Sequence, residues 1–142
     1  MKQEQLQSKD VHTPSNGDVL ISIKHEFARK IYNGTKLIEL RKKYPNIEKY
    51  TYCWIYEPEP IGLITGYYII NDIIDRTPER MWELFHDALG IDKERYDNYY
   101  TGRQHAYGMI IDLAVKLTIP MALREFGLTR PPQSYLFLRN LG

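Results

Sequence analysis

The stretch that decides the fold is VLISIKHEFARKIYNGTKLIELR, residues 19–41. Apolar residues alternate with others over residues 19–24, and this period of two predicts a strand with one buried face. Over residues 26–33 the apolar positions recur at helical spacing, and Gly34 then supplies a residue suited to the left-handed conformation that ends helices. Alternation returns over residues 37–41. The stretch therefore predicts a strand, a short helix and a second strand.

Further short strands and helices are expected along the rest of the chain. The acidic middle, from Thr77 to Gly102, has capping residues, a proline suited to a first helical turn and an internal glycine, which predict an inserted pair of helices. Glycines within the long apolar run suggest the bulges that curl a sheet. The other elements predicted are strands over 49–56, 61–74, 107–117 and 135–138, and a short helix over 120–126. This mixture indicates an α+β fold with a curved sheet.

Length and composition favour one globular domain. The chain has 142 residues, of which 43% are hydrophobic and 26% charged, which allows a core of ordinary size. Residues 1–17 are polar and lack periodicity, so we expect a flexible N-terminal lead followed by a single domain over residues 18–142. Cys53 has no second cysteine to pair with, and no apolar run is long enough to span a membrane. A cytoplasmic protein without a membrane partner is expected.

Charge is distributed unevenly, although the formal net charge is only +1. Lys and Arg number ten against six Asp and Glu in residues 1–50, four against ten in residues 51–100, and five against two in residues 101–142, giving segments of +4, −6 and +3. If the two ends meet in the fold, they form a basic face that suits a polyanion. The alternative is that all these charges lie on ordinary solvated surfaces.

A polar cluster brackets the first predicted helix: Lys24, Thr35, Lys36, Glu39 and Arg41. Glu39 and Arg41 are two residues apart on a strand, so their side chains leave the same face. The planar guanidinium suits a phosphate or a base edge, the lysines suit phosphate oxygens, and the carboxylate can accept from the exocyclic amine of a base. The alternative is that Glu39 and Arg41 form an internal ion pair while the lysines are solvated.

These residues also carry a resemblance to a known family. The pattern Gly-x-Lys-x-x-Glu-x-Arg, which starts at Gly34, resembles the signature of ASCH domains in the PUA-like superfamily. Three later segments, residues 100–102, 106–107 and 131–135, also resemble that family, so the resemblance extends from Val19 to Leu138.

The resemblance implies a PUA-like β-barrel with a short helix after the first strand and an inserted helical pair. It also implies a small stand-alone protein of bacterial or phage type that binds RNA or a modified base, with the signature residues lining a cleft between barrel and helix. One departure is His25, which stands where relatives often have a proline.

Other candidate features favour packing over chemistry. Tyr50, Tyr52, Trp54 and Tyr56 fall on one face of a predicted strand, where they could stack on bases, but core packing is the favoured interpretation, as it is for Tyr96, Tyr99 and Tyr100. Cys53 is expected to be a buried small side chain rather than a nucleophile. The scattered histidines show no ligand spacing, so neither metal nor cofactor is predicted; they are His12, His25, His86 and His105.

Three functions stay open, and binding is favoured over catalysis. The first is a module that binds single-stranded nucleic acid, most simply RNA, or a nucleotide or modified base, through Lys24, Thr35, Lys36, Glu39 and Arg41. The second is a hydrolase, in which Lys36 and Glu39 are the candidate catalytic residues. The resemblance extends to amidohydrolases of acetylcytidine, but Glu39 stands where that branch has threonine; ribonuclease action is the other enzymatic alternative. The third is a protein-interaction domain that docks a partner through its acidic helices.

Overall fold

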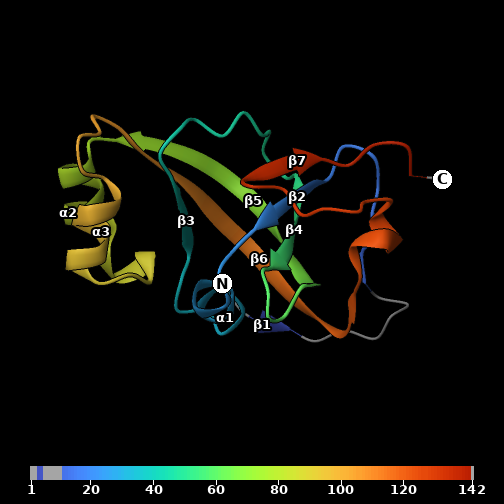
Figure 1. Ribbon diagram of the computed structural model, residues 1–142. Helices are drawn as coiled ribbons and strands as arrows, with labels where there is room; N and C mark the ends of the chain where they lie inside the picture. The colour runs from blue at the N-terminus through green and yellow to red at the C-terminus, as the bar shows by residue number, and fades with distance from the viewer. Residues whose placement is uncertain (1–2, 5–10, 142) are drawn as a thin grey trace.

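One curled sheet of seven strands organises the chain (Figure 1). The computed structural model describes residues 3–4 and 11–141. In chain order the elements are β1 (Gln3–Glu4), β2 (Val19–Ser22), α1 (His25–Tyr32), β3 (Ile38–Arg41), β4 (Tyr52–Glu57), β5 (Leu63–Arg76), α2 (Pro78–Leu89), α3 (Lys93–Tyr99), β6 (Ala106–Met121), a 3-10 helix (Leu123–Phe126) and β7 (Tyr135–Phe137). The predicted α+β class, with a short helix after the first strand of the domain and an inserted helical pair, is confirmed.

Two long antiparallel strands, β5 and β6, form the centre of the sheet. They span 14 and 16 residues. On one side of this pair the order continues through β4 and β2 to β7. On the other side, β6 pairs with β3 in antiparallel and with β1 in parallel orientation at two separate points along its length. The sheet is therefore mixed, and β6 holds β3 beside the helices.

The curl of the sheet has a local cause at Gly66. The pairing of β5 with β6 shifts register between Ile64 and Gly66, which confirms the bulge predicted from the glycines of this run. A Cβ at position 66 would lie 2.2 Å from the Val115 carbonyl oxygen and 2.6 Å from the Tyr32 hydroxyl. Only glycine lets the strand pass this close to its neighbours.

The helical pair α2 and α3 is an elaborated hairpin connection between β5 and β6, since Arg76 and Ala106 are paired at its base. The Thr77 hydroxyl accepts from the Arg80 N–H at 3.1 Å, which caps the start of α2. Gly90 ends α2 with a φ of +64°. The Asp92 carboxylate then caps α3 by accepting from a backbone N–H at 2.9 Å. Both predicted helices are thus confirmed with their capping residues.

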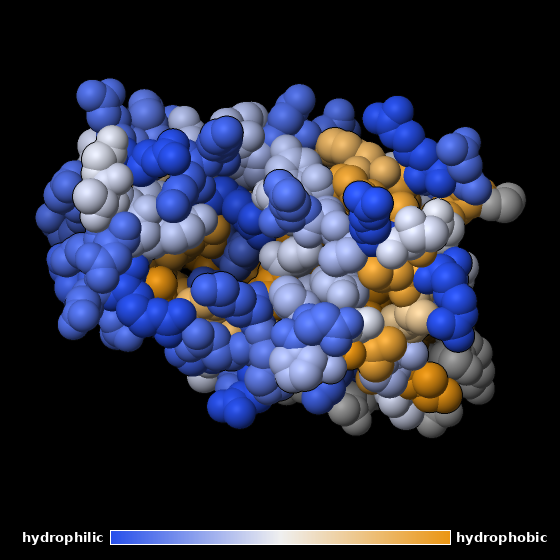
Figure 2. Space-filling model, viewed as in Figure 1, coloured by the Kyte–Doolittle hydropathy of each residue, from blue (hydrophilic) through white to orange (hydrophobic). Residues whose placement is uncertain are grey.

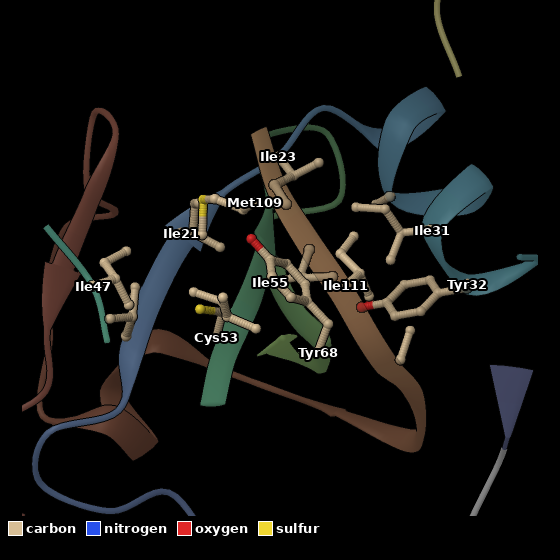
Figure 3. Close-up of a cluster of buried hydrophobic side chains, with 14 residues drawn as sticks. Ile21, Ile23, Ile31, Tyr32, Ile47, Cys53, Ile55, Tyr68, Met109 and Ile111 are labelled. Carbon is tan, nitrogen blue, oxygen red and sulfur yellow. The ribbon is translucent and has the colours of Figure 1, made fainter. Parts of the chain in front are cut away.

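The core consists of apolar clusters that bind these parts together. Figure 3 shows one of them, in which Ile31 and Tyr32 of α1 pack toward Ile55, Tyr68 and Ile111 of the sheet. A second cluster, centred on Trp54, lies against the 3-10 helix. The third joins β3 to α2 and α3. Since β3 contributes its apolar residues to the third cluster, the helical pair is fixed relative to the strand that carries the signature motif.

The N-terminal lead predicted over residues 1–17 falls partly on residues 1–2, 5–10, which lie outside the described residues. Within the rest, β1 pairs with β6, and the His12 ring stacks on Tyr52 with 3.5 Å between ring centroids. The division into a lead and a single domain of residues 18–142 stays a prediction.

Some element boundaries differ from the predictions. The strand predicted from residue 49 begins at Tyr52, because Tyr50 has a φ of +66°. The helix predicted from Pro120 begins at Leu123, because β6 runs to Met121 and tolerates a proline at its end. None of the described helices is long and apolar enough to cross a membrane.

Candidate functional site

The turn after α1 fixes Lys36 between two helices. The backbone N–H groups of Thr35 and Lys36 both donate to the Lys30 carbonyl at 3.0 Å. The next residue, Leu37, donates its N–H to the Ala88 carbonyl of α2 at 2.8 Å. Lys36 therefore lies where α1, β3 and α2 meet.

The Lys36 ammonium is buried, with the residue only 3% exposed. Its Nζ donates to the Leu89 carbonyl at 2.5 Å and lies 4.0 Å from Glu39 Oε1. This carbonyl belongs to the C-terminal turn of α2, where the helix leaves acceptors free and favours a cation. A Cβ at Gly90 would lie 2.8 Å from the Lys36 Cβ, so glycine also makes room for the lysine stem. Burial lowers the pKa of Lys36, and the Glu39 carboxylate opposes that effect.

Glu39 and Arg41 form the ion pair that their spacing allows. Arg41 Nη2 donates to Glu39 Oε2 at 2.9 Å, and Arg41 Nη1 donates to the Ser134 hydroxyl at 3.2 Å. Arg41 Nε is buried and has no hydrogen-bond partner among the described residues. Burial disfavours the charge, but the Glu39 carboxylate together with Tyr68 and Tyr99 favours it, and the net effect raises the pKa of Arg41. The guanidinium is thus held in one orientation by a carboxylate and a hydroxyl.

These charged groups surround a cavity of about 620 Å³, within the range of roughly 300 to 1,000 Å³ common for small-molecule sites. The face drawn in Figure 2 is hollowed between the helical pair and the sheet, with hydrophilic residues around apolar ones. The lining residues are Ser22, Ile23, Lys24, Phe27, Lys36, Glu39, Leu40, Arg41, Ile91, Arg95, Asn98, Tyr99 and Gln133. The lining carries four basic side chains and one acidic one, so its charge favours an anion.

The structure brings together four of the five predicted site residues. Lys24, Lys36, Glu39 and Arg41 all line this cavity. Thr35 is not among the lining residues, and its hydroxyl donates to Asn33 Oδ1 at 2.6 Å in the exposed turn after α1. The geometry therefore assigns Thr35 to the turn, because its side chain caps a local loop instead of facing the hollow.

Helix α3 contributes lining residues that the sequence did not indicate. Arg95, Asn98 and Tyr99 lie more than fifty positions from Arg41, so no local pattern relates them to the motif. Tyr99 donates its hydroxyl to the Leu40 carbonyl at 3.4 Å, and the Lys42 ammonium lies 4.6 Å from its ring centroid. The one faint signal for these residues in the sequence is the group of tyrosines, for which the sequence favours packing.

The aromatic residues of β4 mostly pack in the core. Trp54 and Tyr56 are buried, as the packing interpretation predicted. Tyr52 is half-buried under His12. Tyr50 lies outside the strand and is 68% exposed, so the predicted shared face is wrong at that position. In α3 and at its end, Tyr96 and Tyr100 are buried while Tyr99 lines the cavity.

A second hollow of about 660 Å³ lies between α2 and α3. Its lining includes the aromatic residues Trp82, Tyr96 and Tyr100. Its lining includes both acidic and basic side chains, and the Lys93 ammonium pairs with Asp97 at 2.7 Å. This hollow belongs to the helical insertion and lies apart from the signature residues.

Metal binding and thiol chemistry find no support in the described part of the chain. No group of three or more His, Cys, Asp or Glu side chains could hold a metal ion there. Cys53 is fully buried, as predicted, and burial raises the pKa of its thiol. A protonated, inaccessible thiol is a poor nucleophile.

A curled mixed sheet with an anion-favouring cavity beside its first helix defines a small barrel-like α+β protein. The chain belongs to the ASCH domain family, whose model matches residues 21–116. This confirms the family resemblance seen in the Gly-x-Lys-x-x-Glu-x-Arg pattern.

Relatives extend the comparison. The chain is 25% identical over 131 residues to an ASCH domain-containing ribonuclease of Zymomonas mobilis, covering 89% of this chain and 88% of that one. It is also 22% identical over 121 residues to the large ribosomal subunit protein uL22 of Ureaplasma parvum, of which it covers 39%.

Solved structures support the fold. The crystal structure of ASCH from Zymomonas mobilis matches with a TM-score of 0.80 at 23% identity, over 89% of this chain and 90% of that one. A variant of that protein with a serine replaced by alanine gives the same TM-score over 90% and 92% of the two chains. The predicted PUA-like architecture is thereby confirmed as a curled, barrel-like sheet.

Proposed function

We propose that this protein binds single-stranded RNA by taking one nucleotide into the cavity lined by Lys24, Lys36, Glu39 and Arg41. One observation carries the proposal: charged residues from the N-cap of α1, the turn after α1 and strand β3 converge on a single hollow of about 620 Å³. The charged groups differ in shape: the Lys24 ammonium is a point charge, and the Arg41 guanidinium is a planar fork held in one orientation. Such a set can position a phosphate and read a base edge at the same time.

The chemistry of the lining suits a nucleotide. Lys24 is exposed at the N-cap of α1, where an ammonium can reach phosphate oxygens. Arg41 occupies Oε2 of Glu39, which leaves Oε1 beside the cavity to accept from an exocyclic amine. The half-buried Tyr99 ring lines the cavity with the Lys42 ammonium over it. A base that displaces Lys42 from this ring would gain about 1 to 3 kcal/mol from stacking. The names of the relatives, a ribonuclease and a ribosomal protein, support RNA as the polyanion.

RNA cleavage at the same cavity is the second candidate function. The name of the Zymomonas relative favours it, and so does the position of Lys36, whose pKa is lowered by burial, in the lining of the same cavity. In such a reaction the amine would take the proton of a ribose 2′-hydroxyl, whose oxygen attacks the adjacent phosphorus. The bond from phosphorus to the 5′-oxygen breaks, which leaves a 2′,3′-cyclic phosphate, and the 5′-oxygen takes up a proton from water. Arg41 would stabilise the charge that develops on the phosphate.

Two other functions predicted from the sequence have weaker support. Hydrolysis of acetylcytidine would use Lys36, but Glu39 replaces the threonine of that branch and is engaged by Arg41. Docking of a protein on the acidic helices stays a prediction. Neither has an observation as specific as the convergence on one cavity.

The test of binding is fluorescence anisotropy with a labelled single-stranded RNA between low and physiological salt. Lys24→Ala should weaken binding about threefold to tenfold and reduce the salt slope by about 0.7, the value of one phosphate contact on a single strand. Arg41→Ala should weaken it more. Lys116→Ala removes an exposed charge of β6 outside the cavity and serves as the matched control. Equal effects of Lys24→Ala and Lys116→Ala, or no binding by the wild type, would refute the proposal.

The test of cleavage is gel analysis of the same RNA incubated with protein. If Lys36 transfers a proton, Lys36→Met should slow cleavage by about 100-fold to 10,000-fold. Binding without any cleavage by the wild type would leave the binding module as the function.

A further inference from the structure

An ion pair beside the cavity joins two elements that are far apart in the chain. Arg95 of α3 donates from Nη1 and Nη2 to the two carboxylate oxygens of Glu26 in α1, at 2.7 and 2.8 Å. The guanidinium carbon also lies 5.0 Å from the centroid of the Phe27 ring. Both Arg95 and Phe27 line the cavity. The pair therefore connects the helical insertion to α1 at the edge of the proposed RNA site.

The Glu26 carboxylate occupies the donors that a phosphate would use. An arginine fork binds carboxylate and phosphate with the same two parallel hydrogen bonds. The hydrogen bonds from Arg95 hold the pKa of Glu26 below its ordinary value, with Lys30 and Lys24 acting in the same direction. Both partners are nearly half exposed, so water and incoming anions can reach them. Solvent screens an exposed ion pair, and a phosphate that binds the same guanidinium fork can therefore compete with the carboxylate.

We propose that Glu26 is an internal stand-in for phosphate, and that RNA displaces it so that Arg95 binds a backbone phosphate at the mouth of the cavity. This inference rests on the proposed RNA binding and deepens it. Arg95 adds a phosphate contact from the helical insertion, next to Lys24. Glu26 competes for that contact and thereby sets the affinity and its dependence on salt. RNA lacking a phosphate at that position gains nothing from Arg95.

The experiment compares Glu26→Gln, Arg95→Gln and the double variant with wild type, using a fluorescein-labelled eight-nucleotide RNA in anisotropy titrations. Glu26→Gln should tighten binding about threefold to tenfold, because Arg95 is released from its carboxylate. Arg95→Gln should weaken binding and lower the salt slope by about 0.7. The double variant should match Arg95→Gln, since Glu26 acts through Arg95. Thermal unfolding confirms that each variant is folded.

The matched control is Asp97→Asn, which also removes one negative charge. Asp97 lies in α3, the helix that carries Arg95, and pairs with Lys93 at the other hollow. It should change the affinity less than twofold. The inference is overturned if Glu26→Gln raises the RNA affinity no more than this control does. It is also overturned if the higher affinity persists in the double variant, in which Arg95 is replaced as well. In either case loss of binding in Lys24→Ala still supports the proposed function. If neither the wild type nor any variant binds RNA, both the proposed function and this inference are overturned.

Discussion

The indole nitrogen of Trp54 donates to Asp18 Oδ2 at 3.0 Å, and both side chains are buried. The same oxygen accepts from His12 Nε2 at 2.9 Å and from the Ser15 N–H at 3.0 Å. One carboxylate oxygen thus joins the segment before β2 to the aromatic cluster on β4. Removing a buried acceptor that serves three donors lowers the free energy of unfolding, because the donors are left without a partner.

Asp18→Ala should destabilise the fold by about 2 to 3 kcal/mol, because it leaves the buried indole N–H without an acceptor. Chemical denaturation gives the free energy of unfolding. Asp75→Ala is the control, since Asp75 is an exposed partner of His105 and its loss should cost less than about 1 kcal/mol. Similar costs for the two variants would contradict the prediction.

Glu39→Ala should cost roughly 3 kcal/mol, because Arg41 would keep its charge in a buried place without its carboxylate. Glu83→Ala provides the comparison. Its partner Arg80 is exposed, so the free energy of unfolding should change by less than about 1 kcal/mol. A small loss in Glu39→Ala would mean that solvent reaches the Arg41 guanidinium.

Lys36 should make stability rise with alkaline pH. Burial lowers its pKa in the folded protein, whereas the unfolded chain keeps the proton up to about pH 10.4. Between these values the unfolded state binds more protons, so the free energy of unfolding increases with pH. Denaturation of wild type and Lys36→Met at several pH values isolates this contribution. The difference between the two proteins should grow in favour of wild type as pH rises toward about 10. A constant difference would argue against a depressed pKa.

Gly66→Ala should be among the most damaging small substitutions, at roughly 3 kcal/mol or more, because its Cβ meets a backbone oxygen of β6. Gly102→Ala tests whether backbone conformation alone explains such a loss. Gly102 has a φ of +74° but nothing within 4 Å of an added Cβ, so about 1 kcal/mol is expected. Thermal or chemical unfolding of both variants measures the contrast.

Much of the fold could be predicted because its signals are local. Thr77 and Gly90 bracket α2 as their capping chemistry requires, and alternation identified most of the strands. The sequence predicts the start of β4 too early, because a run of aromatic residues is typical of a strand and gives no information about the dihedral angle of Tyr50. At Tyr50 the positive φ is imposed by the loop, which no periodicity reveals. Pairing of β1 with β6 depends on contacts across the whole chain.

The site was predictable only where the motif is contiguous in sequence. Lys36, Glu39 and Arg41 share a short segment, so their convergence followed from strand geometry. Lys36 was nevertheless expected to act as an open point charge, whereas its ammonium donates to the end of α2. That contact, and the position of Arg95, depend on how the helical insertion folds back on β3. Sequence spacing contains no information about that packing.

The pairing of Arg76 with Ala106 at the base of the helical insertion has an evolutionary consequence. Because the insertion leaves and rejoins the sheet at adjacent points, its exposed residues can change without disturbing the register of β5 and β6, whereas its buried residues and Gly90 are constrained by their contacts with β3 and Lys36. It supplies Asn98 and Tyr99 to the wall of the hollow, while the signature motif comes from elsewhere. Substitutions in this one hairpin connection can therefore reshape the wall of the hollow while the sheet keeps its register.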